Sequence, residues 1–293
     1  MPYGFDLDDE DNRLLRGPIP EQALRWAAAA VGPGSRVRVT EPLAGGMSSA
    51  VHALDIEDAA GRIHELVLRR FVRLDWLAEE PDLSDREATA LSLVEASLVP
   101  TPRLVAASAD AVLMTRLPGQ VEWDPPLRRL AELLPLIHST PVPDGPALPD
   151  YRAYRIRMRR PPRWAHEPEA WLRGIELLDG PPPGDERVFI HRDFHPGNVL
   201  WRDGQVTGLV DWVNASIGSP WADVGHCRVN LAAEIGQEGA DEFLELYRQV
   251  SGRQDEYHPY WDISAAIGGL DEDADDAPSP EDERFLVEAV KRL

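Results

Sequence analysis

Residues 187–213 read Arg-Val-Phe-Ile-His-Arg-Asp-Phe-His-Pro-Gly-Asn-Val-Leu-Trp-Arg-Asp-Gly-Gln-Val-Thr-Gly-Leu-Val-Asp-Trp-Val, and this stretch constrains the chain more than any other. Short apolar runs at 188–190 and 199–201 predict strands on either side of a polar loop. Asp203-Gly204 is a strong tight-turn signal, and residues 205–210 after it predict a further strand. The stretch therefore predicts a β-hairpin with polar side chains at its mouth.

Three of these polar side chains stand at spacings that suit phosphoryl transfer. Asn198 follows Asp193 by five residues, and Asp211 follows Asn198 by thirteen. The reaction needs a group that orients the attacking hydroxyl and oxygen ligands that hold Mg²⁺ on the phosphates. Asp193 suits the first role, and Asn198 and Asp211 suit the second. Ordinary turn chemistry would explain a Gly-Asn turn and two aspartates, but not the spacing, the imidazoles and the apolar flanks together.

The same spacings occur in the catalytic loop and metal aspartate of the protein-kinase-like fold, with His191-Arg192-Asp193 standing for His-Arg-Asp. With Asp211-Trp212 in place of Asp-Phe-Gly, the stretch resembles the aminoglycoside phosphotransferase family, strongly here and more loosely over most of the chain. The resemblance implies an α+β, bilobal protein-kinase-like fold, with a small antiparallel-sheet lobe and a larger, mainly helical lobe. We expect a nucleotide-binding lobe at 1–117, including a leader and a hinge, and a catalytic and acceptor-binding lobe at 118–293.

Composition narrows the class of protein. The 293 residues are 43% hydrophobic, with no apolar run near the ~18 residues of a membrane span, which predicts a soluble protein. The N-terminus has neither the basic nor the apolar part of a secretory signal. Cys227 is the single cysteine, which excludes an intrachain disulfide and favours the cytoplasm. A net charge of −21 disfavours nucleic acids and membranes as partners and favours cationic ligands, although it also serves solubility alone.

In the first lobe we expect a loose leader at 1–18, a helix ending at Val31, and strands at 37–43, 50–56 and 65–71. A glycine turn separates the first two strands and lets backbone N–H groups approach phosphate oxygens. Such a turn is often only a hairpin, and it lacks the Gly-x-Gly-x-x-Gly of protein kinases. Its position in the resembled family favours the phosphate role, which we assign to Gly45, Gly46, Ser48 and Ser49.

The third strand carries Arg69 where protein kinases have a lysine that holds nucleotide phosphates. A guanidinium can bind phosphate oxygens in a bidentate manner, although it departs from the lysine pattern. Arg69 and Arg70 face opposite sides of the strand, so at most one serves the site. Kinase-like folds pair this cation with a helix glutamate, and Glu87 is the matching residue. Ser84 and Glu87 also fit a capping box, so pairing and capping remain alternatives.

A buried strand is predicted at 111–115, and Pro118-Gly119 breaks the pattern after it. The break predicts a hinge, where backbone groups of Thr115 and Leu117 would bind an adenine-like base. Such a break is also common loop punctuation.

Helices are predicted in the second lobe at 127–138, 167–178, 242–250 and 283–293, with His138 as a packing or capping residue. Asp223 is expected to brace the catalytic loop beside His191, or to cap a helix starting near Val224. Trp261 and Asp262 suit either an acceptor ligand or a packed corner. The acids of 271–283 form either an acidic wall for ammonium groups, as the resemblance implies, or an acidic loop.

These observations predict an ATP- or GTP-dependent, Mg²⁺-requiring O-phosphotransferase acting on a small molecule. An aminoglycoside or similar cationic polyol is the favoured acceptor. A choline or sugar kinase is the alternative within the same reaction class. A nucleotide-binding protein without transferase activity is the alternative from another class, suggested by the missing lysine. Protein-kinase activity is disfavoured because the segment after Asp211 is short and has no Ala-Pro-Glu motif. The sequence does not indicate the nucleotide preference or the oligomeric state.

Overall fold

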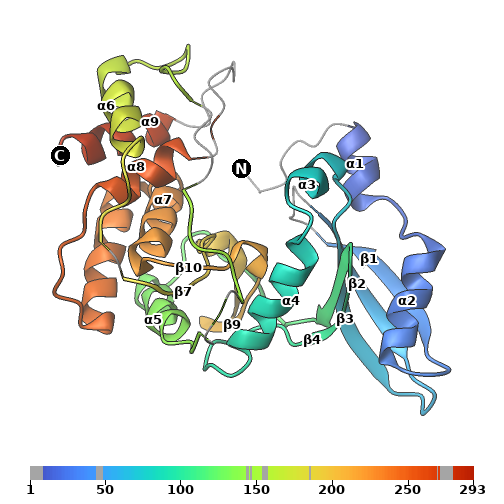
Figure 1. The fold of residues 1–293 in the computed structure, drawn as a ribbon. Coiled ribbons are helices and arrows are strands. Elements are labelled where there is room, and N and C mark those ends of the chain that lie inside the picture. The colour runs from blue at the N-terminus through green and yellow to red at the C-terminus, as the bar shows by residue number, and fades with distance from the viewer. Residues whose placement is uncertain are drawn as a thin grey trace. The chain divides into compact units, whose positions relative to one another are not determined.

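The computed structural model describes residues 9–43, 49–142, 145, 147–153, 158–184, 186–268, 270 and 280–293. The chain forms two compact units (Figure 1). The N-terminal unit comprises residues 1–96 and 101–118, and the C-terminal unit comprises residues 97–100 and 119–293.

The N-terminal unit is built on a five-stranded antiparallel sheet with the strand order β1-β2-β3-β5-β4. The predicted strands form, with ends that differ by at most two residues. The strands are β1 (Arg36–Pro42), β2 (Ala50–Glu57), β3 (Ile63–Arg70), β4 (Leu104–Ser108) and β5 (Ala111–Thr115).

Alternation along these strands gives the sheet two different faces. One face carries apolar side chains such as Leu54, Leu68 and Leu113, which form a core with Ala27 of helix α2 (Glu21–Val31). Because neighbouring residues of a strand face opposite ways, Arg69 belongs to the other face. Helix α4 (Leu83–Val94) lies on that side, across the sheet from α2 (Figure 1). Helix α3 spans Leu74–Glu79.

The expectation of a loose leader at 1–18 was wrong for its second half. Helix α1 spans Asp9–Arg16, and Leu15 is only 2% exposed. The segment is tied to β2, because the His52 ring donates from Nε2 to the Gly17 carbonyl over 3.1 Å. Acidic composition alone did not reveal this contact, since it depends on a partner far along the chain.

The C-terminal unit holds short strands and five described helices. β6 (Gln120–Val121), β8 (Val199–Arg202) and β9 (Gln205–Leu209) form one sheet, and β7 (Val188–Ile190) pairs with β10 (Ser216–Gly218). The helices are α5 (Leu127–His138), α6 (Pro168–Leu178), α7 (Pro220–Ser251), α8 (Tyr260–Ile267) and α9 (Pro280–Val290).

The predicted hairpin forms between β8 and β9. Its turn residues Asp203 and Gly204 have φ of 52° and 70°, the positive values that a two-residue turn of this kind requires. The helices expected near Val224 and at 242–250 are instead both parts of α7. Gly236 interrupts α7 with φ 86° and ψ 171°, and the helix resumes after it.

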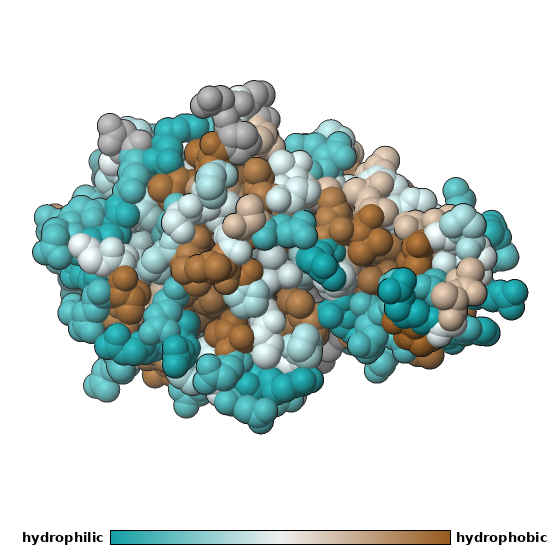
Figure 2. Space-filling model, turned by 90° about the horizontal axis from the view of Figure 1, so that it is seen from below, coloured by the Kyte–Doolittle hydropathy of each residue, from teal (hydrophilic) through white to brown (hydrophobic). Residues whose placement is uncertain are grey.

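Across the part of the chain that the structure describes, no helix combines the length and apolar character that crossing a membrane requires. On the face shown in Figure 2, hydrophobic side chains occur in patches separated by hydrophilic ones. Small apolar patches that hydrophilic residues separate are normal on protein surfaces.

Asp262 lies in a buried ionic corner, which decides between the two readings of its role. Its side chain is 0% exposed, as is that of Arg228 from α7, and Nε of Arg228 donates to Asp262 over 2.9 Å. The Tyr257 hydroxyl and Arg292 also donate to Asp262. Its charge is therefore satisfied inside the protein, which favours the packed-corner alternative for this residue.

We predict that Arg228→Met destabilises the chain by about 3–5 kcal/mol, because Asp262 would stay buried without its main partner. The exposed pair of Arg25 and Glu21 supplies the matched control, and Arg25→Met should have a much smaller effect. Urea denaturation at pH 7 measures both. Equal effects of the two substitutions would contradict the prediction.

Candidate active site

The backbone of the predicted catalytic loop is fixed by one buried carboxylate. Asp223 is 0% exposed, and its two oxygens accept from the backbone N–H of His191 at 3.0 Å and of Arg192 at 2.6 Å. Arg192 adopts φ 68°, a left-handed conformation that costs energy for a residue other than glycine. Ser219 caps α7, so Asp223 lies inside the helix and is not its cap.

Asp223 is itself held by a chain of two side chains. His138, at the end of α5, lies 3.1 Å from Asp223 through Nε2 and 3.2 Å from the Tyr247 hydroxyl through Nδ1. Burial raises the pKa of Tyr247, so its hydroxyl keeps its proton and donates to Nδ1. Nε2 of His138 then carries the ring hydrogen and donates to Asp223.

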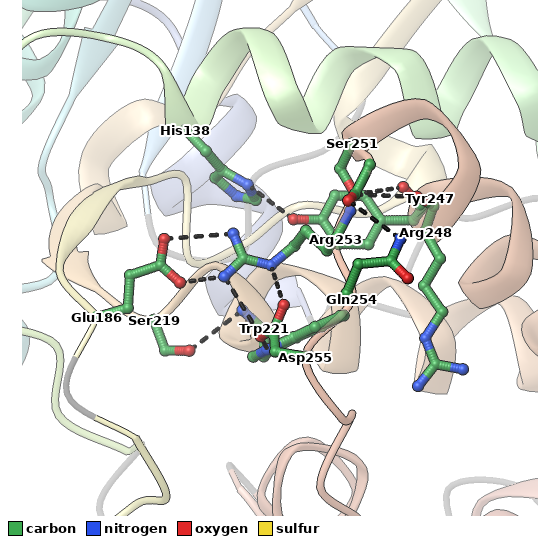
Figure 3. A network of polar contacts seen from close by, with 11 residues as sticks. His138, Glu186, Ser219, Trp221, Tyr247, Arg248, Ser251, Arg253, Gln254 and Asp255 are labelled. Carbon is green, nitrogen blue, oxygen red and sulfur yellow. Dashed lines mark hydrogen bonds and ion pairs between the residues drawn. The ribbon is translucent and has the colours of Figure 1, made fainter.

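Figure 3 shows His138 directed at the Tyr247 hydroxyl, within a larger polar network. In that network Arg253 pairs with Glu186 and Asp255, and the Trp221 indole donates to Asp255. His138, which was expected to pack or to cap a helix, packs edge-on against Tyr247 and also forms a hydrogen-bonded link between α5 and α7.

Asp193 is held from two sides. Its Oδ1 lies 3.0 Å from Nε2 of His226, and the Asn198 amide donates to the Asp193 carbonyl over 2.8 Å. Burial favours the neutral carboxyl, but the hydrogen bond from His226 and the electrostatic attraction to the same side chain outweigh it, so the pKa of Asp193 is lowered. The side chain is therefore a carboxylate near pH 7. No role was predicted for His226 from the sequence. Its spacing from Asp223 by three residues was the available signal.

Among the residues that the structure describes, Asp193, His195 and His226 bring potential ligand atoms within 4.8 Å of one another. Gly197 donates its N–H to Nδ1 of His195 over 3.2 Å, which leaves the ring hydrogen on Nε2. Burial lowers the pKa of His195 to about 4, so the ring is neutral. A nitrogen that carries hydrogen does not ligate a metal, so this tautomer disfavours a metal centre here.

Asn198 and Asp211 fit Mg²⁺ by the chemistry of their donors. The Asn198 amide nitrogen is used by Asp193, which leaves the amide oxygen as its ligand atom. Asp211 adopts φ 67° and ψ 61°, and the residue before it is fixed twice: Val210 donates to the Asn198 carbonyl and accepts from His191 Nε2, both at 2.9 Å. A carboxylate and an amide oxygen are ligands that Mg²⁺ prefers, and the magnesium role of both residues stays a prediction.

In the N-terminal unit, Arg69 pairs with Glu87 as one alternative expected. Nη1 of Arg69 donates to Glu87 over 2.9 Å and Nε donates to the Ser49 hydroxyl over 2.7 Å, with all three residues buried. The capping-box alternative was wrong. Glu87 turns towards the sheet, and the Ser84 hydroxyl donates to the carbonyl groups of Ser108 and Ala111.

The remaining residues predicted to bind nucleotide are only partly described. Gly45, Gly46 and Ser48 lie outside the described residues. The N–H of Thr115 donates to the Arg103 carbonyl, and the N–H of Arg116 donates to the Glu65 carbonyl. These two N–H groups are therefore not available to a base, because the sheet uses them. The role of Leu117 in binding a base stays a prediction.

A small cavity in the C-terminal unit is lined in part by His226. Trp261 also lines this cavity, whereas the next residue, Asp262, belongs to the buried corner. The ring centroids of Trp261 and Tyr151 are 5.8 Å apart. The lining residues are Tyr151, Arg192, Ala222, His226, Trp261, Ser264 and Ala265.

An ionised aspartate on a braced loop, an amide and a carboxylate suited to magnesium, and a buried arginine–glutamate pair in a sheet define the class as a kinase-like phosphotransferase. A family model described as the phosphotransferase enzyme family matches residues 39–261, and the chain belongs to this family.

Comparison with known proteins agrees with this assignment. An aminoglycoside 3'-phosphotransferase from Enterococcus faecalis is 29% identical over 77 residues, which cover 26% of this chain and 28% of that protein. The match to this curated relative therefore spans less than a third of its length.

Two solved structures match over nearly the whole chain. A thermostable mutant of the aminoglycoside phosphotransferase APH(4)-Ia, in a ternary complex with AMP-PNP and hygromycin B, has a TM-score of 0.55 and 16% identity, covering 88% of this chain and 94% of its own. The macrolide 2'-phosphotransferase MphH from Brachybacterium faecium has a TM-score of 0.54 and 19% identity, covering 92% and 88%. The predicted α+β, protein-kinase-like fold is confirmed.

His195 should make stability depend on pH. Its pKa in the folded chain, about 4, lies below the ordinary 6.5, so the unfolded chain binds more protons between these values. The free energy of unfolding should therefore fall as the pH is lowered through this window, and less steeply in His195→Gln. Urea denaturation at pH 4.5, 5.5 and 7 compares the two proteins. Parallel pH profiles would show that His195 is not buried as a neutral ring.

Proposed function

We propose that this chain transfers the γ-phosphoryl group of ATP or GTP to a hydroxyl group of a small molecule. The observation that carries the proposal is Asp193, which is ionised, partly exposed and held on a loop that also presents Asn198. Membership of the phosphotransferase enzyme family supports it.

In the proposed reaction the acceptor oxygen bonds to the γ-phosphorus, and the bond from that phosphorus to the bridging oxygen of the β-phosphate breaks. The hydroxyl proton passes to Asp193, and the products are a phosphate ester and a nucleoside diphosphate. Asp193 orients the hydroxyl and takes its proton, a role typically worth about 10²–10⁴-fold in rate.

Charge on the phosphates would be balanced by a magnesium ion and by Arg69. Asn198 and Asp211 would hold Mg²⁺, which when bound neutralises negative charge on the phosphate oxygens. Arg69 would contact phosphate oxygens, with its guanidinium oriented by Glu87 and Ser49. The fixed orientation of the fork explains how an arginine can serve where protein kinases use lysine.

Two acceptor classes fit the chain. An aminoglycoside or similar cationic polyol is supported by the acidic composition, by the Enterococcus faecalis relative, and by the neighbour that binds hygromycin B. A neutral or less cationic alcohol is supported by the satisfied charge of Asp262 and by Arg192, which lines the small cavity. Choline and simple sugars represent this second class.

The proposal is tested by nucleotide consumption with Mg²⁺, using ATP and GTP in parallel against aminoglycosides, macrolides, choline and sugars. Asp193→Ala should lower acceptor-dependent turnover by about 10²-fold or more while nucleotide affinity stays within a few-fold. Asp179→Ala is the matched control, because Asp179 is a 71% exposed carboxylate on the surface.

Full turnover in Asp193→Ala would overturn the assigned role of Asp193. Nucleotide binding without stimulation by any acceptor in the panel would favour a nucleotide-binding protein that performs no transfer.

A further inference from the structure

His226 contacts Asp193, although the sequence patterns that predicted the catalytic residues did not include His226. Nε2 of His226 lies 3.0 Å from Oδ1 of Asp193, a normal hydrogen-bond distance. Both side chains are about one-fifth exposed, at 19% and 23%, so the contact lies at the edge of the solvent. The other oxygen of Asp193 lies 3.4 Å from the Asn198 amide nitrogen, which is a weaker contact. His226 is thus the closer of these two side-chain partners.

Helix α7 supports the loop and the carboxylate from the same turn. Asp223 and His226 are three residues apart, so they lie on one face of the helix. Asp223 holds the backbone N–H groups of the loop, and His226 holds the side chain of Asp193. A change in the position of this turn would therefore move both the loop and the base.

The turn cannot shift easily, because α7 packs tightly on the start of α8. A Cβ atom placed on Gly225, next to His226, would lie 2.5 Å from the Trp261 carbonyl oxygen. Only glycine permits this approach. The imidazole of His226 is therefore presented to Asp193 by backbone that is itself held in place.

We propose that His226 is a positioning residue for Asp193, whose carboxylate it orients for the acceptor hydroxyl. This inference rests on the proposed function. His226 donates through Nε2 to Oδ1, and Oδ2, which has only the weaker contact to the Asn198 amide, would receive the hydroxyl proton. The donated hydrogen bond restricts the carboxylate to one orientation.

Other charged and titratable groups also face this pair, so a test must distinguish the effect of His226 on Asp193 from their effects. His191 and His195 belong to the same loop, and the His195 and His226 ring centroids are 5.8 Å apart. Arg192 and Tyr151 line the cavity with His226. Asp211 acts on His195, and Asp223 lies one turn earlier on α7.

The kinetic test compares His226→Ala, which removes the hydrogen bond, with His226→Gln, whose amide can replace the donor. In His226→Ala we expect kcat to fall by about tenfold or more, with the KM for nucleotide within about twofold. His226→Gln should recover most of kcat, which would not occur if His226 only supported the fold. His64→Gln, at a histidine paired with Asp58 in the N-terminal unit, is the control and should change neither kcat nor KM.

A second measurement does not depend on turnover. Crystal structures of the wild type and of both His226 variants show the orientation of the Asp193 carboxylate. We expect the carboxylate to leave its wild-type orientation in His226→Ala and to keep it in His226→Gln. Thermal unfolding of each variant establishes that it is folded.

The possible outcomes separate this inference from the proposed function. An unchanged orientation of the Asp193 carboxylate in His226→Ala would overturn the inference whether or not the protein is active. A lower kcat that His226→Gln does not recover would also overturn it, because it would show a merely structural role. Absence of acceptor-dependent turnover in the wild type would count against the proposed function, while the crystal structures would still decide on His226.

Discussion

Asp223 is a carboxylate with no exposure to solvent, and such a group must be satisfied by donors inside the protein. Its donors are the backbone N–H groups of His191 and Arg192 and the ring of His138. In the loop that satisfies Asp223, Arg192 adopts a left-handed conformation, which the hydrogen bond to Asp223 stabilises. The position of Asp193, the next residue, follows from this one arrangement.

The rest of the loop is fixed by hydrogen bonds that return to the hairpin. His191 donates to the Val210 carbonyl, and Val210 donates to the carbonyl of Asn198, so both predicted magnesium ligands are tied to the same pair of strands. The hairpin is therefore more than a connection between strands. It brings Asn198 and Asp211 under one set of backbone constraints, although thirteen residues separate them in sequence.

Much of this could be predicted from the sequence, because local patterns determine it. The apolar runs and Asp203-Gly204 predicted β8, the turn and β9, and the spacing from Asp193 to Asp211 predicted the phosphotransferase class. Glu87 was harder to predict, since a capping glutamate and a pairing glutamate follow the same sequence pattern. Only the position of α4 beside the sheet decided between them.

The features that were missed depend on contacts between distant residues. His226 approaches Asp193 from another element, and no local periodicity reports such a contact. Asp262 looked equally suited to a ligand or a corner, because its partner Arg228 lies 34 residues away within α7. Helix α1 was missed for the same reason, because the residue that follows it, Gly17, is held by His52 of β2. In each case the sequence shows the residue and its charge, but it does not show which distant residue the folded chain brings into contact with it.

The most direct test of this account is a crystal structure of the chain with Mg²⁺ and a non-hydrolysable ATP analogue. We expect Mg²⁺ bound through the amide oxygen of Asn198 and the carboxylate of Asp211, with Asp193 making no bond to the metal and still paired with His226. A metal held instead by Asp193, His195 and His226, with Asn198 and Asp211 uninvolved, would contradict the account.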